Sequence, residues 1–133
     1  MLEKDMIQTH GFKNVPAGAD ITGFQVRIRI PYYRGIWASL LEGADVTVDG
    51  EEFGRDGILW TIGDRTLTLA QVEASTDLRW PFDEPAVLTV TKPGGLAVGM
   101  HDIGVKLAWR ASYMPPDMGP WISRGERKLT ITR

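Results

Sequence analysis

The chain contains no cysteine among its 133 residues. That absence excludes disulfide bonds, a thiolate nucleophile and any zinc site built from cysteine ligands. A chain without cysteine is compatible with a reducing compartment, and we expect the protein to be cytoplasmic.

Strong charge of one sign and long apolar runs are also missing. The formal net charge is -2, and no long basic tract is present, so the sequence predicts no nucleic-acid partner. No stretch of 18 apolar residues exists, so we predict no membrane-spanning segment and no membrane partner. Residues 1–11 lack the apolar core of a signal peptide.

Glycine and proline are plentiful instead. Fifteen glycines and eight prolines indicate frequent turns between short elements, and we find no convincing helix longer than two turns. A chain of this length suits one domain. We therefore expect a single domain over residues 1–133, and leave residues 1–11 open as a loosely ordered N-terminal extension.

Alternation of apolar and polar residues predicts short strands. The clearest strand covers residues 22–30, where Phe24, Val26 and Ile28 alternate with polar residues. Asp49-Gly50 is a strong hairpin signal, whereas residues 35–41 and 71–76 are ambiguous between helical and other structure. About eight or nine strands favour an all-β fold, an antiparallel β-sandwich ahead of a closed barrel. The other predicted strands cover residues 44–48, 51–53, 57–62, 65–69, 78–82, 86–91, 100–113 and 128–132, and residues 16–20, 63–64, 92–95 and 114–120 are predicted as turns or loops.

Chemically active groups do not form a recognisable set. His101 precedes Asp102, but neighbouring strand residues face opposite sides, so a surface or turn histidine is the favoured interpretation over a general base. The acidic pairs at 51–52 and 83–84 flank turns, where acids are usually solvated. The glycine-rich stretch 92–99 has its lysine before the glycines, unlike a phosphate-binding loop. We predict no catalytic residue and no metal ligand in this chain.

Aromatic residues carry more information. One dense run covers residues 32–37, and a second pair flanks the proline-rich stretch 114–120. Tyr, Trp and Arg are enriched in protein interfaces. Ordinary packing is the competing interpretation, and apolar neighbours favour a core position for Trp37, Trp60 and Trp109. The candidates for a subunit interface or a substrate mouth are Tyr32, Tyr33, Arg34, Trp37, His101, Tyr113 and Trp121.

Several segments together resemble the small β subunit of bacterial C-glycoside deglycosidases. The resemblance extends from about Phe12 to about Pro115, and the ordered set is more specific than any single motif. The segments are Pro31–Leu40, Val46–Glu51, Arg79-Trp80, Lys92–Leu96 with Gly99–His101, and Arg110–Pro115.

The resemblance implies one half of a heteromeric carbon–carbon lyase. Such enzymes combine a β-sandwich β subunit with an α subunit, a sugar-isomerase-like TIM barrel that holds a divalent manganese or magnesium ion and needs the β subunit for activity. Their substrates are 3-oxo-C-glucosides of flavonoids or related aromatics, cleaved between the anomeric and an aromatic carbon. The resemblance therefore implies that the acid–base groups and the metal belong to the α subunit, and that this chain binds no cofactor.

Two other functions remain open from the residues. A noncatalytic carbohydrate-binding module could use tryptophan and tyrosine rings as sugar platforms. A standalone β-sandwich enzyme could place His101 and Asp102 in its active site, although residue spacing ranks this alternative lowest.

Overall fold

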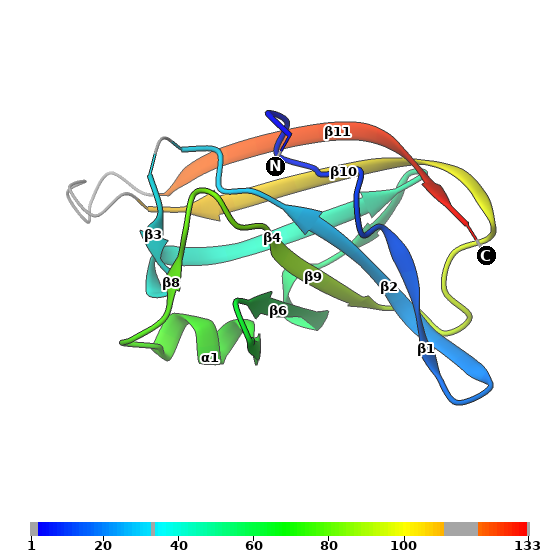
Figure 1. Cartoon of the computed structure of the whole chain (residues 1–133), viewed down its shortest axis with the longest axis horizontal. Helices are drawn as coiled ribbons and strands as arrows, with labels where there is room; N and C mark the ends of the chain where they lie inside the picture. The colour runs from blue at the N-terminus through cyan, green and yellow to red at the C-terminus, as the bar shows by residue number, and fades with distance from the viewer. Residues whose placement is uncertain (1–2, 33, 111–119, 133) are drawn as a thin grey trace.

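The computed structural model describes residues 3–32, 34–110 and 120–132, and within them two antiparallel sheets form a sandwich. Figure 1 shows β11, β10 and β4 side by side, with β2 and β9 crossing them at an angle. The five-stranded sheet has the order β1 (Lys13–Ala17), β2 (Asp20–Ile28), β9 (Ala86–Thr91), β6 (Ile58–Ile62), β7 (Arg65–Thr68). The four-stranded sheet has the order β11 (Trp121–Ile131), β10 (Gly99–Trp109), β4 (Leu41–Val48), β5 (Glu51–Phe53).

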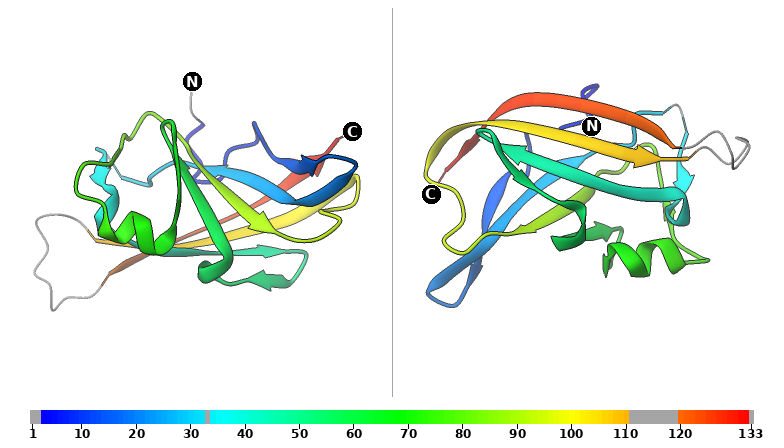
Figure 2. Two further views of the ribbon diagram at one scale, coloured as in Figure 1. Left: turned by 90° about the horizontal axis from the view of Figure 1, so that it is seen from below. Right: turned by 180° about the vertical axis from the view of Figure 1, so that it is seen from behind.

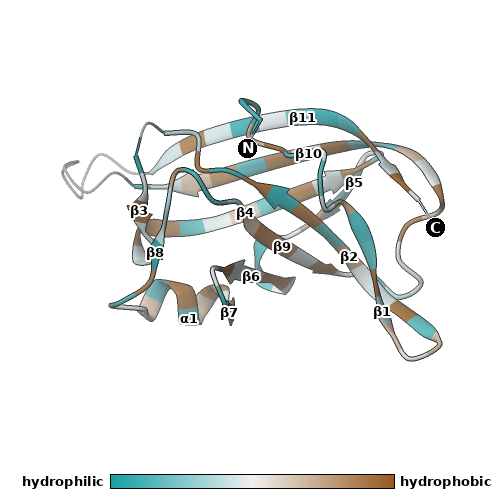
Figure 3. Cartoon of the chain, in the orientation of Figure 1, coloured by the Kyte–Doolittle hydropathy of each residue, from teal (hydrophilic) through white to brown (hydrophobic). Residues whose placement is uncertain are grey.

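The core lies between the two sheets and comes from alternate residues of each strand. In β2, Phe24, Val26 and Ile28 are fully buried, and in β10 the same alternation buries Ile103 and Leu107. Figure 3 shows the resulting bands of hydrophobic and hydrophilic residues along these strands. The predicted all-β sandwich is confirmed, and the predicted hairpin turn at Asp49-Gly50 has positive φ at both residues, 50° and 88°.

At the sheet edges one predicted turn and one predicted strand boundary were wrong. Residues 16–20 were predicted as a turn, but Pro16 and Ala17 belong to β1, where the register shifts between Val15 and Pro16. A proline fits there because an edge strand leaves one row of N–H groups without strand partners. The last strand begins at Trp121, seven residues before the predicted start, because its polar and charged residues alternate with half-buried ones.

A short ribbon and one helix cover one end of the sandwich. The ambiguous residues 35–41 contain β3 (Ile36–Trp37) and a single 3-10 turn, η1 (Ala38–Leu40), and β3 pairs with β8 (Arg79–Trp80). A second 3-10 turn, η2 (Arg55–Gly57), precedes β6. The helix α1 (Leu69–Ala74) starts at a capping box between Thr68 and Gln71 and contacts η1 and β4. Figure 2 shows this end from two further directions.

The N-terminal residues pack along the side of the sandwich. Met6 and Ile7 are buried, and Ile7 forms an isolated bridge with Ile28 of β2. Arg127 of β11 donates to the Ile7 carbonyl at 2.9 Å and pairs with the Glu3 carboxylate at 2.8 Å. This segment therefore ties β2 to β11 across the gap between the sheets. In the described residues no helix is long and apolar enough to cross a membrane.

Candidate functional site

The structure divides the candidate residues between two ends of the molecule. His101 lies near the start of β10, and Trp109 ends the same strand, roughly 26 Å away at about 3.3 Å per residue. Tyr32 and Trp121 contact the Trp109 ring, and Trp37 lines the same hollow as Tyr32, so all three belong to the Trp109 end. Tyr33 and Tyr113 lie outside the described residues, so their predicted roles have no structural counterpart here.

A cluster of three rings closes the Trp109 end of the core. Trp109 and Trp121 are paired across β10 and β11, with centroids 5.0 Å apart and planes at 80°. Tyr32 touches both, at 5.0 Å from Trp109 and 5.9 Å from Trp121. Trp109 is buried and its indole Nε1 donates to Ser123 Oγ at 3.1 Å, whereas Trp121 remains 37% exposed. The cluster is thus anchored in the core and reaches the surface through Trp121.

Trp37 is 46% exposed, so its predicted core position was wrong. In the two-residue strand β3, Ile36 takes the inward face, and alternation turns Trp37 outward. The Arg79 guanidinium lies 5.5 Å from the Trp37 ring centroid and donates through Nη2 to the Gly35 carbonyl at 3.2 Å. A side chain at Gly35 would lie 2.6 Å from the Trp80 carbonyl, so only glycine permits this close approach of β3 and β8.

The hollow beside these rings is small. Its volume is about 80 Å³, whereas pockets that enclose drug-sized molecules occupy about 300–1,000 Å³. Its lining includes Tyr32, Arg34, Trp37, Leu40 and Arg79. An exposed aromatic and cationic surface without a deep pocket is suited to contact with another protein.

Two of the larger hollows lie away from the aromatic end and have no Trp, Tyr or Phe in their lining, whereas another, of about 380 Å³, includes Phe53. One, of about 540 Å³, lies on the outer face of the four-stranded sheet, and the other, of about 630 Å³, lies beside the N-terminal segment. The first is lined by Thr47, Gly50, Asp102, Ile103, Gly104, Glu126, Arg127 and Lys128, and the second by Glu3, Gln8, Thr9, His10, Arg27, Asp83 and Pro85. Neither hollow therefore offers an aromatic platform for a sugar ring.

His101 joins two loops at the other end of the sandwich. Its Nδ1 lies 2.6 Å from Asp49 Oδ2, and its Nε2 lies 2.7 Å from the Ala97 carbonyl oxygen. Both partners accept hydrogen bonds, and only the doubly protonated imidazolium donates from both nitrogens. The Ala97 carbonyl, with Asp49 adding to it, raises the pKa of His101. The Asp102 backbone N–H, followed by His101, lowers the pKa of Asp49.

This arrangement fits a structural histidine better than a catalytic one. The His101 side chain is 11% exposed, less than expected for the surface residue predicted from sequence. The Asp102 carboxylate pairs with Lys128 Nζ at 2.5 Å and not with His101. Both ring nitrogens of His101 therefore already have hydrogen-bond partners within the chain. Within residues 3–32, 34–110 and 120–132, no three His, Asp or Glu side chains are placed to hold a metal ion.

Three contacts at these two ends were missed by the sequence reasoning. They are the Arg79 guanidinium over Trp37, the Asp49 carboxylate on His101, and the ion pair between Arg110 and Glu42. Arg79 had one available signal, since it lies in the Arg79-Trp80 pair that carries the family resemblance. The others join residues 52 and 68 positions apart, and no local pattern indicates such pairs.

The known proteins that this chain matches are beta subunits of deglycosidases. The family model described as "C-glycoside deglycosidase beta subunit" matches residues 2–113. A protein of that name from Eubacterium cellulosolvens is 40% identical over 116 residues, which cover 86% of this chain and 79% of the relative. A "3'-dehydrocarminate deglycosidase beta subunit" from Microbacterium is 36% identical, over 73% of each chain. A C-glycoside deglycosidase beta subunit from Arthrobacter globiformis is 34% identical, over 71% of this chain and 72% of the relative.

Proposed function

Because the chain belongs to the family of C-glycoside deglycosidase beta subunits, we propose that it binds an α subunit and enables that subunit to cleave carbon–carbon glycosidic bonds. The match covers residues 2–113, which include Tyr32, Trp37 and His101 but not Trp121. The resemblance noted in the sequence is thereby confirmed. The partner's fold, the metal and the reaction are parts of the proposal.

The proposed substrate is a 3-oxo-C-glucoside of a flavonoid or related aromatic. One relative is named for a 3'-dehydro substrate, which supports an oxidised sugar. A ketone at C3 acidifies the proton on C2, so a base removes that proton and an enolate forms. The bond from C1 to the aromatic carbon then breaks, C1 and C2 become doubly bonded, and the aromatic carbon takes a proton from an acid. The reaction is an elimination, and no water is consumed.

We assign the acid–base groups and the divalent metal, manganese or magnesium, to the α subunit. In the part of the chain that the structure describes, the side chains do not fit a metal site, since no three ligands converge. His101 has both nitrogens engaged by Asp49 and Ala97. In this proposal the β subunit contributes a surface and not a reacting group. A cytoplasmic location, where a dedicated oxidoreductase could supply the 3-oxo substrate, belongs to the same proposal.

The exposed Trp37 with Arg79 stacked over it is the observation that carries the docking role. A tryptophan that is 46% exposed and held by a cation is costly to leave in water and suited to an interface. Trp121 adds a second exposed ring beside the Tyr32 and Trp109 anchors. We propose that these two indoles contact the α subunit near the mouth of its barrel, where TIM-barrel active sites lie.

The function is tested by co-expressing the chain with a candidate α subunit. The two chains should copurify, and together they should release the free aglycone from a 3-oxo-C-glucoside, which neither releases alone. Elimination predicts that the first sugar product lacks the elements of water relative to 3-oxoglucose, which mass spectrometry measures. Activity of this chain by itself, or weak binding of glucosides without a partner, would favour the enzyme or carbohydrate-module alternative.

A further inference from the structure

The four-stranded sheet has one edge that is much longer than the other outer edges of the two sheets. β11 runs for 11 residues and pairs with β10 from Gly99↔Ile131 to Trp109↔Trp121 with no shift in register. By contrast, β5 has 3 residues and β7 has 4, whereas β1 has 5 with a proline and a register shift. Short strands, prolines, bulges and charged side chains protect a sheet edge from further pairing, and of these β11 has only charged side chains.

The direction of the backbone groups on β11 follows from contacts on β10. Asp102 accepts from Asp49 N with its carbonyl and donates its N–H to Asp49 Oδ1, so both groups point toward β4. Successive residues alternate, so Ile103 points toward β11 and forms a hydrogen-bonded pair with Arg127. Odd-numbered residues of β11 therefore bond to β10. The even-numbered residues turn their N–H and C=O groups to the open edge: Ile122, Arg124, Glu126, Lys128 and Thr130.

This edge has no backbone partner among the described residues. The N-terminal segment bonds to the backbone of Arg27 in β2 and of Arg29 just after it. Its hydrogen bonds to β11 are made by the Arg127 side chain and not by the β11 backbone. Its Met6 and Ile7 side chains lie beneath Gly125, on the inner face. The same even-numbered residues point their side chains to the outer face of the sheet, where four of the five are charged or polar and all are exposed.

We propose that the β11 edge pairs antiparallel with β11 of a second copy of this chain, so that two four-stranded sheets become one. The pairing is centred on Gly125, which places Arg124 opposite Glu126 of the second copy, twice by symmetry. Even-numbered residues then face even-numbered residues, as the open backbone groups require. The inference is independent of the proposed function, because it uses only the strand's backbone and charges.

Charge favours this register over the one centred on Glu126. A pairing centred on Glu126 also aligns the open backbone groups, but it sets Glu126 against its own copy and Arg124 against Lys128. Like charges directly opposite one another destabilise a sheet, whereas opposite charges stabilise it. In the pairing centred on Gly125, the central position has no side chains that could clash, and Lys128 faces the uncharged Ile122.

Charge exchange between the two central residues tests the pairing. The purified full chain, alone and in its complex, is measured by sedimentation velocity and light scattering over a concentration series. Native protein should contain two copies, and Glu126→Arg or Arg124→Glu should each raise the dimer dissociation constant at least about tenfold. The double variant Arg124→Glu/Glu126→Arg should restore the native constant, because the opposite-charge pairs are reformed with their signs exchanged.

Glu52→Arg serves as the matched control. It makes the same charge change on an exposed residue of β5, at the other edge of the same sheet, and should leave the dimer unchanged. A native chain that stays monomeric up to roughly 1 mM would overturn the proposal. Three other results would also overturn it. The first is a dimer dissociation constant that neither single variant changes, and the second is a double variant whose dissociation constant does not return to the native value. The third is that Glu126→Arg releases a different protein, and not a second copy of this chain, from the complex. Circular dichroism of each variant identifies any that fails to fold, and the double variant then decides.

Discussion

Trp60 and Trp80 form a matched pair of buried indoles that differ in one hydrogen bond. Both are fully buried, and their rings meet edge to face at 6.0 Å. Trp80 Nε1 donates to the Glu84 carbonyl at 2.9 Å, whereas Trp60 Nε1 has no acceptor among the described residues. Trp80 also pairs with Ile36, so it anchors the ribbon that carries Trp37 and Arg79. We predict that Trp80→Phe is the more damaging substitution.

The difference in stability between the two variants has three contributions. Phenylalanine is smaller than tryptophan by about 40 Å³, and a cavity of that size costs about 1 kcal/mol in either variant. Trp80→Phe also loses a net hydrogen bond of about 0.5–1.5 kcal/mol. Trp60→Phe removes a buried unpaired donor, which returns about 1–3 kcal/mol. Trp80→Phe should therefore lower the free energy of unfolding by about 1.5–4.5 kcal/mol more than Trp60→Phe does.

Urea denaturation followed by far-ultraviolet circular dichroism measures this difference without relying on tryptophan fluorescence. The midpoint should fall much further for Trp80→Phe, with the same slope in both variants. Equal midpoints, or a lower midpoint for Trp60→Phe, would refute the assignment of the hydrogen bond and of its absence. Ser123→Ala would then show whether the third buried indole, Trp109, behaves as its own bond predicts.

Three further predictions concern the loops, the sheet and the N-terminal segment. In thermal unfolding, His101→Gln should lose more stability at about pH 5.5 than at pH 8.5. The pKa of His101 is raised in the folded chain, so its stabilising contribution is complete below the ordinary value of 6.5 and is lost as pH rises through the pKa of the folded state. A pH-independent loss would contradict this. Gly23→Ala should cost about 1–3 kcal/mol or more in urea titrations, because its Cβ would lie 2.0 Å from the Val90 carbonyl, whereas Gly54→Ala meets nothing within 4 Å and should be nearly neutral. Arg127→Met should speed hydrogen exchange at Gln8 N more than at Phe24 N, because it removes the contacts of Arg127 to Glu3 and Ile7. Equal protection of Gln8 N in the native and variant proteins would show that Arg127 does not hold the N-terminal segment in place.

Sequence patterning predicted the elements whose register is set by burial. β2 alternates in period two because one face meets the core, and the turn at Asp49-Gly50 needs residues that accept positive φ. Both features are local, so a single sequence carries them. The strand β1 was missed because Pro16 normally marks a turn, and only its place at a sheet edge permits it.

The site was less predictable because its contacts are long-range. The apolar neighbours of Trp37 suggested a core position, but a two-residue strand has only one inward position and Ile36 occupies it. The sequence around His101 does not reveal Asp49 or the Ala97 carbonyl, which the β4–β5 turn and the loop before β10 bring to it. Burial periodicity predicts faces of strands, whereas partners across a sandwich depend on topology.

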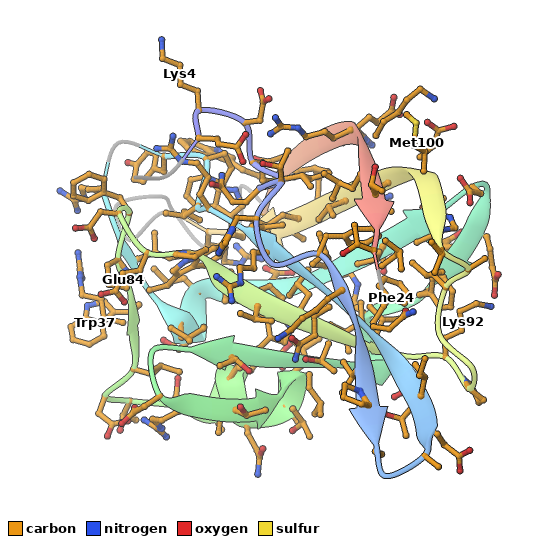
Figure 4. All side chains as sticks on the ribbon, turned by 45° about the vertical axis from the view of Figure 1, so that its right-hand side comes forward. Lys4, Phe24, Trp37, Glu84, Lys92 and Met100 are labelled. Atoms are coloured by element: carbon orange, nitrogen blue, oxygen red, sulfur yellow. The ribbon has the colours of Figure 1, made fainter. Side chains whose placement is uncertain are left out.

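We propose that the exposed indoles at the Trp109 end bind the α subunit. The direct test is the affinity of the α subunit for native chain, Trp37→Ala, Trp121→Ala and the control Met100→Ala, measured by calorimetry. Met100 is 68% exposed, and Figure 4 shows Trp37 and Met100 at opposite sides of the molecule. Trp37→Ala should bind about 30-fold more weakly, as for an interface hot spot of about 2 kcal/mol, and Met100→Ala should keep the native affinity. Native affinity in both tryptophan variants, with the fold intact, would contradict the claim.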